Sequence, residues 1–511
     1  MADLETGHRP RPAPSEAGRT GAAGERRFPA GFVWGVATSA YQIEGGVDAD
    51  GRGPSIWDTF AAAGHARGDT GAVAADHRRR MADDVALLAD LGLPAYRLSI
   101  AWPRVQPDGR GAPSARGLDF YRALVDELLA HDIEPFVTLY HWDLPQALED
   151  AGGWPERDTA GCFADFADIV GRALGDRVHH WTTVNEPWCA AMLGYGAGTH
   201  APGRGDPAAA VAAAHHLLLG HGLAVDALRD HVRTDVATGT GADAGSGNRA
   251  PGDGDDGPKI GITFNPYPVV AAGDDEADHD AARRIDGIAN RLWYDAVLRG
   301  RYPDDVLDDL ATVSDLAHIR DGDLAQISRP VDSLGLNYYR RYHVRHEAGA
   351  SAAPSPWPGS PDVAFTEAGG SPTSNGWAVE PPGLYEALIR LTSDYDPPPL
   401  YVHENGGAFP DRVDDDGRVR DHDRIAFLDA HLRAGHDAIA AGIDLRGFFV
   451  WSLLDNFEWA EGYAQRFGIV HVDFTTQRRV PKDSARWLAD VVRSNKLDAG
   501  LLSPPGSRPA S

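Results

Sequence analysis

Short apolar runs alternate with longer amphipathic segments along most of the chain. Amphipathic stretches such as 81–91, 118–130, 162–174, 208–228 and 424–441 have apolar residues at helical spacing. In the first of them Val85, Leu88 and Leu91 share one face, and Gly92 follows as a typical helix end. Eight apolar runs between such segments predict strands, at 32–37, 95–100, 134–140, 181–184, 259–264, 332–337, 400–402 and 445–451.

The strand runs are continuously apolar, which is typical of parallel strands covered by helices on both faces. Eight strand–helix units favour a closed (β/α)8 TIM barrel, with long loops at its C-terminal face, over an open doubly wound sheet. A single barrel of this kind can extend to roughly 400 residues and more. We therefore expect one α/β domain over 28–490 of the 511 residues.

Four polar segments lie outside this pattern. Residues 1–27 and 491–511 are rich in Pro, Gly and Ser or Arg, and predict disordered terminal tails. The Gly/Ala/Asp-rich stretch 234–258 predicts a flexible surface loop, and 347–375 a second loop. None of them separates two domains.

Charge and composition exclude several classes of protein. The chain has 48 Lys and Arg against 75 Asp and Glu, a formal net charge of −27. This field repels nucleic acid, and the longest basic run, at 78–80, has acidic neighbours. No run approaches the ~18 apolar residues that span a membrane, and 1–27 lacks the apolar centre of a secretory signal. Two cysteines, Cys162 and Cys189, suggest neither a disulfide framework nor zinc, so we expect a cytoplasmic protein without metal.

Polar and aromatic residues concentrate where the predicted strands end, which is where barrel enzymes carry their active sites. Amides, carboxylates and imidazole suit sugar hydroxyls, and indoles suit the apolar faces of sugar rings. A phosphate site would need a Gly-rich turn or clustered cations, and no such motif is present. The residues are Gln42, Arg97, His141, Trp142, Asn185, Glu186, Asn337, Tyr339, Glu404, Trp451, Glu458 and Trp459.

Two of these carboxylates, Glu186 and Glu404, can face each other across a closed barrel. A protonated and an ionised carboxyl group together cleave glycosidic bonds. Arg97, inside an apolar strand, needs an anionic partner and can keep one carboxylate ionised. Each carboxylate alone reads equally well as a loop-end group, and the residues themselves leave open which is the acid and which the nucleophile.

Taken together, the motifs resemble glycoside hydrolase family 1, the family of retaining β-glucosidases. The resemblance covers about 28–487. The segments that carry it are Phe32–Ser39, Tyr41–Gly45, Tyr96–Arg104, Tyr140–Pro145, Trp181–Pro187, Gly335–Tyr339, Glu404–Gly406 and Trp451–Trp459.

The resemblance implies roles for individual residues. Glu186 is expected to be the acid/base and Glu404 the nucleophile, with carboxyl groups ~5–5.5 Å apart and no cofactor. Arg97 would hold Glu404 ionised. The remaining substrate-side residues implied are Gln42, His141, Asn185, Glu458 and Trp459 at the glycone hydroxyls, Trp451 under the ring, Asn337 and Tyr339 steadying the site, Trp377 as an aglycone platform, and Trp142 and Phe467 beside the substrate.

Two departures from the family pattern stand out. His403 precedes the expected nucleophile where the family has Thr or Ser. It could alter local hydrogen bonding or the pH optimum, or strand alternation could point it away from the site. The stretch Gly376–Pro381 also differs, which affects the rim beyond Trp377.

The expected substrates are small β-glucosides or cello-oligosaccharides, cut at the terminal non-reducing β-D-glucosyl residue, as in cellulose degradation. β-Galactosides and β-fucosides are further candidates. A 6-phospho-β-glycosidase would need a cationic pocket near Glu458 and Trp459, and 460–463 contains no Lys. A plant-type thioglucosidase lacks the acid/base Glu, and a silent sugar-binding protein would have lost Glu186 or Glu404.

Overall fold

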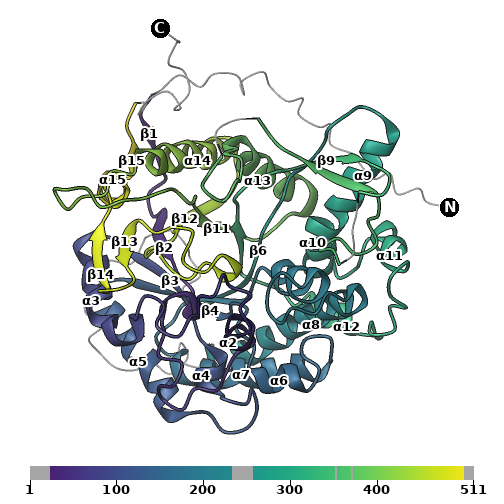
Figure 1. The fold of residues 1–511 in the computed structure, drawn as a ribbon, viewed down its shortest axis with the longest axis horizontal. Coiled ribbons are helices and arrows are strands. Elements are labelled where there is room, and N and C mark those ends of the chain that lie inside the picture. The colour runs from purple at the N-terminus through teal and green to yellow at the C-terminus, as the bar shows by residue number, and fades with distance from the viewer. Residues whose placement is uncertain (1–23, 233–256, 351–353, 370–371, 500–511) are drawn as a thin grey trace, which may run out of the picture.

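Eight parallel strands close into one barrel, which confirms the predicted fold (Figure 1). The computed structural model describes residues 24–232, 257–350, 354–369 and 372–499. The strands predicted at 134–140, 259–264 and 445–451 begin and end as predicted. Around the barrel the strands are β2 (Val33–Ala37), β3 (Ala95–Ser99), β4 (Glu134–Tyr140), β5 (His180–Asn185), β6 (Lys259–Phe264), β8 (Ser333–Asn337), β11 (Leu400–Asn405) and β12 (Leu445–Trp451).

Helices cover the outside of the barrel, so the strands are buried on both faces. Their inner faces contribute to a separate aromatic cluster that includes Phe136, Tyr401 and Phe449. This double burial explains the continuous apolar runs in the sequence. The covering helices are α3 (His77–Asp90), α5 (Ala115–Ala130), α7 (Asp158–Leu174), α8 (Pro207–Val232), α9 (Glu276–Asp286), α10 (Leu292–Arg299), α11 (Asp304–Leu310), α12 (Asp323–Ile327), α13 (Pro381–Tyr395), α14 (His422–Ala440) and α15 (Asp483–Ser494).

Helix α8 is, among the described residues, the one segment whose length and composition would suit a membrane span. Its most apolar window is 78% buried inside the molecule, and the helix packs against α7. Core packing therefore accounts for its apolar character.

Several short strands and helices lie outside the barrel strands and their covering helices. One of them corrects the prediction of a loop over 347–375: within it, Val363–Thr366 forms β10, which pairs antiparallel with β9. Four residues between Pro- and Ser-rich flanks gave no visible strand pattern. The additional elements are β7 (Val269–Ala271), β9 (Tyr342–His346), β13 (Val470–Asp473), β14 (Arg478–Pro481), α1 (Ala40–Ile43), α2 (Ile56–Ala62), α4 (Trp102–Val105), α6 (Gln146–Asp150), the π-helices η2 (Cys189–Ala197) and η3 (Gly287–Arg291), and the 3-10 helix η4 (Trp459–Glu461).

The folded chain extends beyond both predicted boundaries, 28 and 490. Strand β1 (Arg26–Arg27) pairs antiparallel with β15 (Lys496–Leu497), and Figure 1 shows the pair beside α14 and α15. Tertiary contacts hold these segments in place. The Trp34 indole donates to Asn495 Oδ1 at 2.9 Å, and Leu497 is fully buried. The rest of the predicted tails, 1–23 and 500–511, and nearly all of the predicted loop 234–258 lie outside the described residues.

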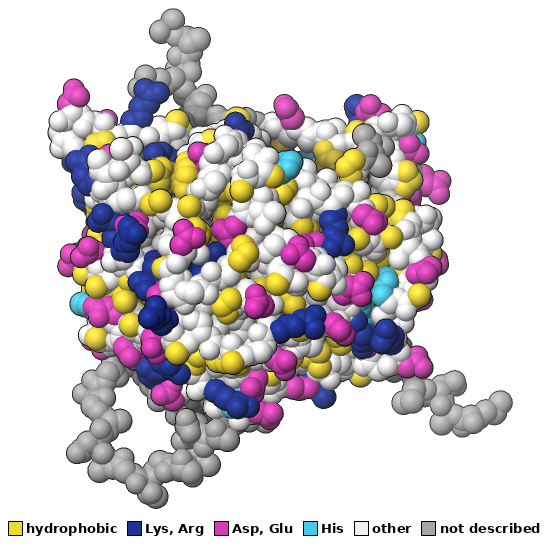
Figure 2. Space-filling view, turned by 60° about the horizontal axis from the view of Figure 1, so that its bottom comes forward, with side chains coloured by type: hydrophobic (Ala, Val, Ile, Leu, Met, Phe, Trp, Pro, Cys, Tyr) yellow, Lys and Arg dark blue, Asp and Glu magenta, His cyan; other side chains and the backbone are white. Residues whose placement is uncertain are grey.

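Figure 2 shows one face of the molecule, on which acidic and basic side chains are interspersed. Charges of both signs therefore compensate each other locally on this face, despite the net charge of −27.

The tight interior of the barrel makes Gly335 on β8 sensitive to substitution. A Cβ there would lie 2.2 Å from His403 Nδ1 and 2.4 Å from Thr263 Oγ1. Overpacking of a core costs typically about 1–3 kcal/mol. We expect Gly335→Ala to lower the free energy of unfolding by at least that amount, measured by urea denaturation.

The matched control is Gly161→Ala on α7, where a Cβ meets nothing within 4 Å. Replacing an exposed helical Gly by Ala stabilises by about 1 kcal/mol. Equal effects of the two substitutions would contradict the interpretation of Gly335.

Candidate active site

A bulge in β11 places Glu404 inside the barrel. The ladder register of β11 shifts between Val402 and Glu404 against β8, and between Val402 and Asn405 against β12. Such a bulge interrupts the alternation of side chains and re-aims them. His403, two residues after the inward-facing Tyr401, lies in the barrel interior by ordinary alternation, edge-on to Phe449 with ring centroids 5.7 Å apart.

In the described part of the chain, the ring contacts of His403 are with Phe136, Tyr401 and Phe449, which are not among the expected site residues. Its Nδ1 lies 2.8 Å from Thr263 Oγ1. Burial, reinforced by the charge of Arg97, lowers the pKa of His403 well below its usual value. The imidazole is thus neutral near pH 7 and fills space where the family has a hydroxyl residue.

Both carboxylate oxygens of Glu404 accept a hydrogen bond. Arg97 Nη1 donates to Oε1 at 2.5 Å, and the Tyr339 hydroxyl donates to Oε2 at 2.8 Å. Burial raises the pKa of Glu404, while the charge and hydrogen bond of Arg97 oppose that rise. Because a cation touches Glu404, ionisation is favoured on this carboxyl group over its neighbours.

Glu186 directly follows β5 in a left-handed backbone conformation, with φ of +47°. This conformation costs a non-glycine residue about 1–3 kcal/mol and is frequent at functional sites. Asn337 Nδ2 donates to Oε1 at 2.6 Å. Burial, and next the negative charge of Glu404, raise the pKa of Glu186 to about 8. Glu186 therefore holds a proton at neutral pH.

The thiol of Cys189 also contacts Glu186, which the sequence did not reveal. Its Sγ lies 3.0 Å from Glu186 Oε2 and accepts from Asn265 Nδ2 at 3.5 Å. Burial raises the pKa of Cys189 well above its usual value, so the thiol stays protonated and donates. The sequence held one indication of this contact. Cys189 follows Glu186 by three residues at the start of η2, and residues at that spacing share a helix face.

On the other side of the carboxylates, polar side chains form a second group. Gln42 Nε2 donates to Asn456 Oδ1 at 3.0 Å and to Glu458 Oε2 at 3.3 Å. Burial, then the charges of Glu404 and Glu186, raise the pKa of Glu458 to about 8. These groups offer donors and acceptors suited to hydroxyls.

His141 and Asn185 connect this group to the carboxylates. Asn185 Nδ2 lies 3.2 Å from His141 Nε2, and Asn185 Oδ1 accepts from Arg97 at 2.7 Å. Burial and the Arg97 charge lower the pKa of His141 well below its usual value, so its ring is neutral. Within the described part of the chain, His141 Nδ1 has no protein partner and can serve a ligand.

Aromatic rings border both groups. The ring centroids of Trp142 and Trp459 are 4.5 Å apart, and the Trp142 indole N–H donates to the backbone oxygen of Asn185 at 2.9 Å. Trp451 stacks 5.8 Å from His141.

The ring centroid of Trp377 lies 5.4 Å from that of Tyr339 and 6.1 Å from that of Phe467, and these rings pack in one cluster with Trp451. The site residues expected from the sequence therefore lie in one group, most of them at or just after the C-terminal ends of the barrel strands.

Two further aromatic neighbours were missed because they lie away from the strand ends. The ring centroids of Trp57, on α2, and Trp459 are 4.6 Å apart, and those of His200 and Trp142 are 5.7 Å apart. As for metals, the described residues contain no group of three or more His, Cys, Asp or Glu placed to hold an ion.

Comparison with known proteins agrees with this geometry. The model of glycosyl hydrolase family 1 matches residues 24–497. A bifunctional β-D-glucosidase/β-D-fucosidase of Bifidobacterium breve is 48% identical, over 90% of this chain and 97% of its own. A thermostable β-glucosidase B of Thermobispora bispora is 50% identical, over 94% and 93%.

Solved structures give the same answer. The psychrophilic β-glucosidase of Micrococcus antarcticus superimposes with a TM-score of 0.85 at 45% identity, over 92% of this chain and 98% of its own. The family 1 β-glucosidase of Thermotoga maritima, in complex with isofagomine lactam, gives 0.84 at 43% identity, over 93% and 100%. The chain therefore belongs to glycosyl hydrolase family 1 and is a glycoside hydrolase.

Proposed function

We propose that the enzyme is a retaining β-glucosidase that releases terminal, non-reducing β-D-glucosyl residues from small β-glucosides or cello-oligosaccharides, the soluble products of cellulose degradation. β-Fucosides and β-galactosides are proposed as further substrates. The observation that carries the proposal is the unequal environment of two carboxyl groups. Glu404 contacts a guanidinium, whereas Glu186 lies beside an anion and keeps its proton.

In the first step the ionised Glu404 attacks the anomeric carbon while Glu186 gives its proton to the leaving oxygen. This forms a covalent glycosyl-enzyme. Glu186, now ionised, takes a proton from water, and that water displaces Glu404. Two inversions at one carbon retain its configuration.

The remaining residues hold the sugar during these steps. Gln42, Glu458, His141 and Asn185 offer donors and acceptors to the hydroxyls, and Trp451 supports the ring face. Because His141 and Glu458 are held in place by Asn185 and Gln42, the hydroxyl partners are oriented before the substrate arrives.

The alternatives fit these contacts less well. A 6-phospho-sugar needs cations, whereas the polar group around Gln42 contains the carboxyl group of Glu458, which cannot supply positive charge. A thioglucosidase or a silent sugar-binding protein would not need both Glu186 and Glu404 in a hydrogen-bonded arrangement.

The first test concerns the nucleophile. Glu404→Ala should lose at least about a thousandfold in kcat on p-nitrophenyl β-D-glucoside, because no covalent intermediate can form. Added azide should restore p-nitrophenol release and yield the α-glucosyl azide. A β-azide from this variant would assign the nucleophile elsewhere, and no wild-type turnover of the substrate would refute the β-glucosidase proposal.

The second test concerns the proton on Glu186. Its pKa of about 8 means that the acid is protonated below that pH and lost above it. We expect kcat/KM for a poor leaving group to fall tenfold per pH unit above about pH 8. For Glu186→Ala, kcat/KM should not change with pH in this range when the leaving group is 2,4-dinitrophenolate, because this group departs without a proton. A persistent basic limb in that variant would assign the limb to another group.

The third test concerns Cys189. Its thiol donates to Glu186 and so favours the ionised form of that carboxyl group. Cys189→Ala should move the basic limb of the pH profile to higher pH, whereas Cys189→Ser, which keeps a donor, should leave it in place or lower it. Coincident limbs in all three enzymes would show that the contact does not control this pKa.

A further inference from the structure

A basic side chain, that of Arg340, lies close to Trp377. Arg340 follows Tyr339 in the segment between β8 and β9 and is partly exposed. Its guanidinium carbon lies 5.0 Å from the ring centroid of Trp377 and 5.0 Å from that of Tyr342. Among the described residues no carboxylate pairs with it. The adjacent Arg341, in contrast, pairs with Glu380 and Glu386.

This arrangement is unexpected in a chain with 75 acidic and 48 basic residues. Two ring faces stabilise the guanidinium by cation–π contact, and a side-chain hydrogen bond also joins it to the Tyr342 hydroxyl. A guanidinium presents these N–H groups as a rigid fork, which fits a planar carboxylate in a bidentate manner. Because no carboxylate among the described residues neutralises it, the guanidinium of Arg340 is suited to an anion supplied by a ligand.

Aromatic contacts connect Arg340 with the surroundings of both catalytic carboxyl groups. Trp377 is next to Tyr339, which donates to the nucleophile. Tyr267 stacks on Tyr342 with centroids 4.2 Å apart, and lies 5.6 Å from Trp188, two residues after Glu186.

Electrostatics supports the same placement. Burial raises the pKa of Tyr267 well above its usual value, and the charges of Glu186 and Arg340 act on it in opposite senses. Both charged groups are thus within electrostatic reach of one phenol.

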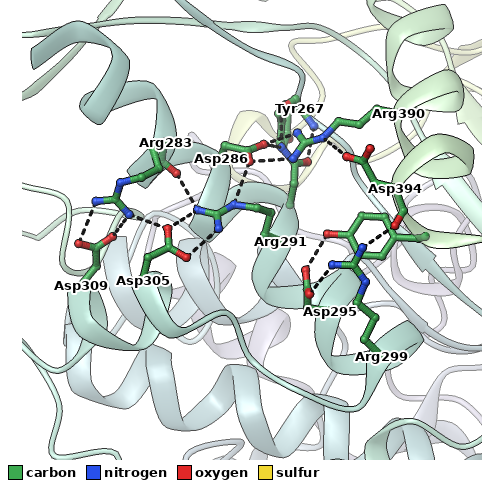
Figure 3. Close-up of polar contacts among 12 residues, drawn as sticks. Tyr267, Arg283, Asp286, Arg291, Asp295, Arg299, Asp305, Asp309, Arg390 and Asp394 are labelled. Atoms are coloured by element: carbon green, nitrogen blue, oxygen red, sulfur yellow. Dashed lines mark hydrogen bonds and ion pairs between the residues drawn. The ribbon is translucent and has the colours of Figure 1, made fainter. Parts of the chain in front are cut away.

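A network of ion pairs fixes the platform that carries Arg340. The side chain of Asn290 bonds both backbone groups of Tyr267, at 3.1 Å and 2.8 Å, and donates to Asp286 at 2.9 Å. Asp286 in turn pairs with Arg291 and Arg390 (Figure 3). Since Tyr267 stacks on Tyr342, the ring under Arg340 is held from the outside of the barrel as well.

We propose that Arg340 is a specificity-determining residue of the leaving-group site and selects β-glucosides whose aglycone is an aromatic carboxylic acid. The aromatic ring packs at Trp377, and the carboxylate at its far end accepts two hydrogen bonds from the guanidinium. This inference rests on the proposed β-glucosidase activity and adds the chemical class of the aglycone.

The test compares two substrates that differ in charge alone at the far end of the ring. These are 4-carboxyphenyl β-D-glucoside and its neutral amide, 4-carbamoylphenyl β-D-glucoside, with kcat/KM measured for each. The ratio of the two values is taken within one enzyme preparation, so it does not depend on the fraction of folded protein. Differences in leaving-group chemistry cancel when this ratio is compared between variants.

We expect Arg340→Gln to lower the acid-to-amide ratio about tenfold, the effect of losing charge-assisted hydrogen bonds, and Arg340→Lys to retain part of it. Arg345→Gln on β9 is the matched control, because it removes one exposed cation nearby. A ratio unchanged within twofold in Arg340→Gln, or lowered equally in Arg345→Gln, would overturn the proposal. Turnover of p-nitrophenyl β-D-glucoside by every variant would show that the proposed activity itself stands.

Discussion

The buried contact between Arg97 and Glu404 is the interaction on which the rest of the site depends. Moving two charges out of water costs several kcal/mol for each ion, and a close pair with further hydrogen bonds offsets that cost. The second amino group of Arg97 donates to Asn185, Asn337 donates to Asn185 and to Glu186, and one connected chain results. One cation thereby orients both carboxyl groups and decides which of them gives up its proton.

The barrel makes this contact possible, because β3, β5, β8 and β11 are far apart in sequence but end at the same mouth. Each contributes one member of the chain of hydrogen bonds: Arg97, Asn185, Asn337 and Glu404. Parallel pairing fixes the height of each residue along the axis. The bulge of β11 and the left-handed backbone of Glu186 then aim the two carboxyl groups, at places where regular strand geometry would not.

Much of this was predictable, and the limits have physical causes. Buried parallel strands are long, apolar and bounded by turn residues, so β4, β6 and β12 could be delimited from the sequence. Residues at strand ends, such as His141 and Trp451, followed from the barrel itself. The bulge that turns Glu404 inward was not predictable, because alternation is a local pattern and a bulge is set by the neighbouring strands. Strand β15 and the contacts of Cys189 and Arg340 depend on partners distant in the chain. The residues alone also left the two carboxyl roles undecided, since pKa values arise from burial and neighbours.

The pairing of β1 with β15 has a mechanical consequence. Arg26 lies opposite Leu497 and Arg27 opposite Lys496, so the outermost residues of the two strands are direct partners. A force that pulls the two chain ends apart meets the ladder one rung at a time, in the manner of a zipper, and not all rungs together in shear. Under load, the β1–β15 pair therefore separates first, at low force. The closed barrel, whose strands are paired on both sides, bears the load only afterwards.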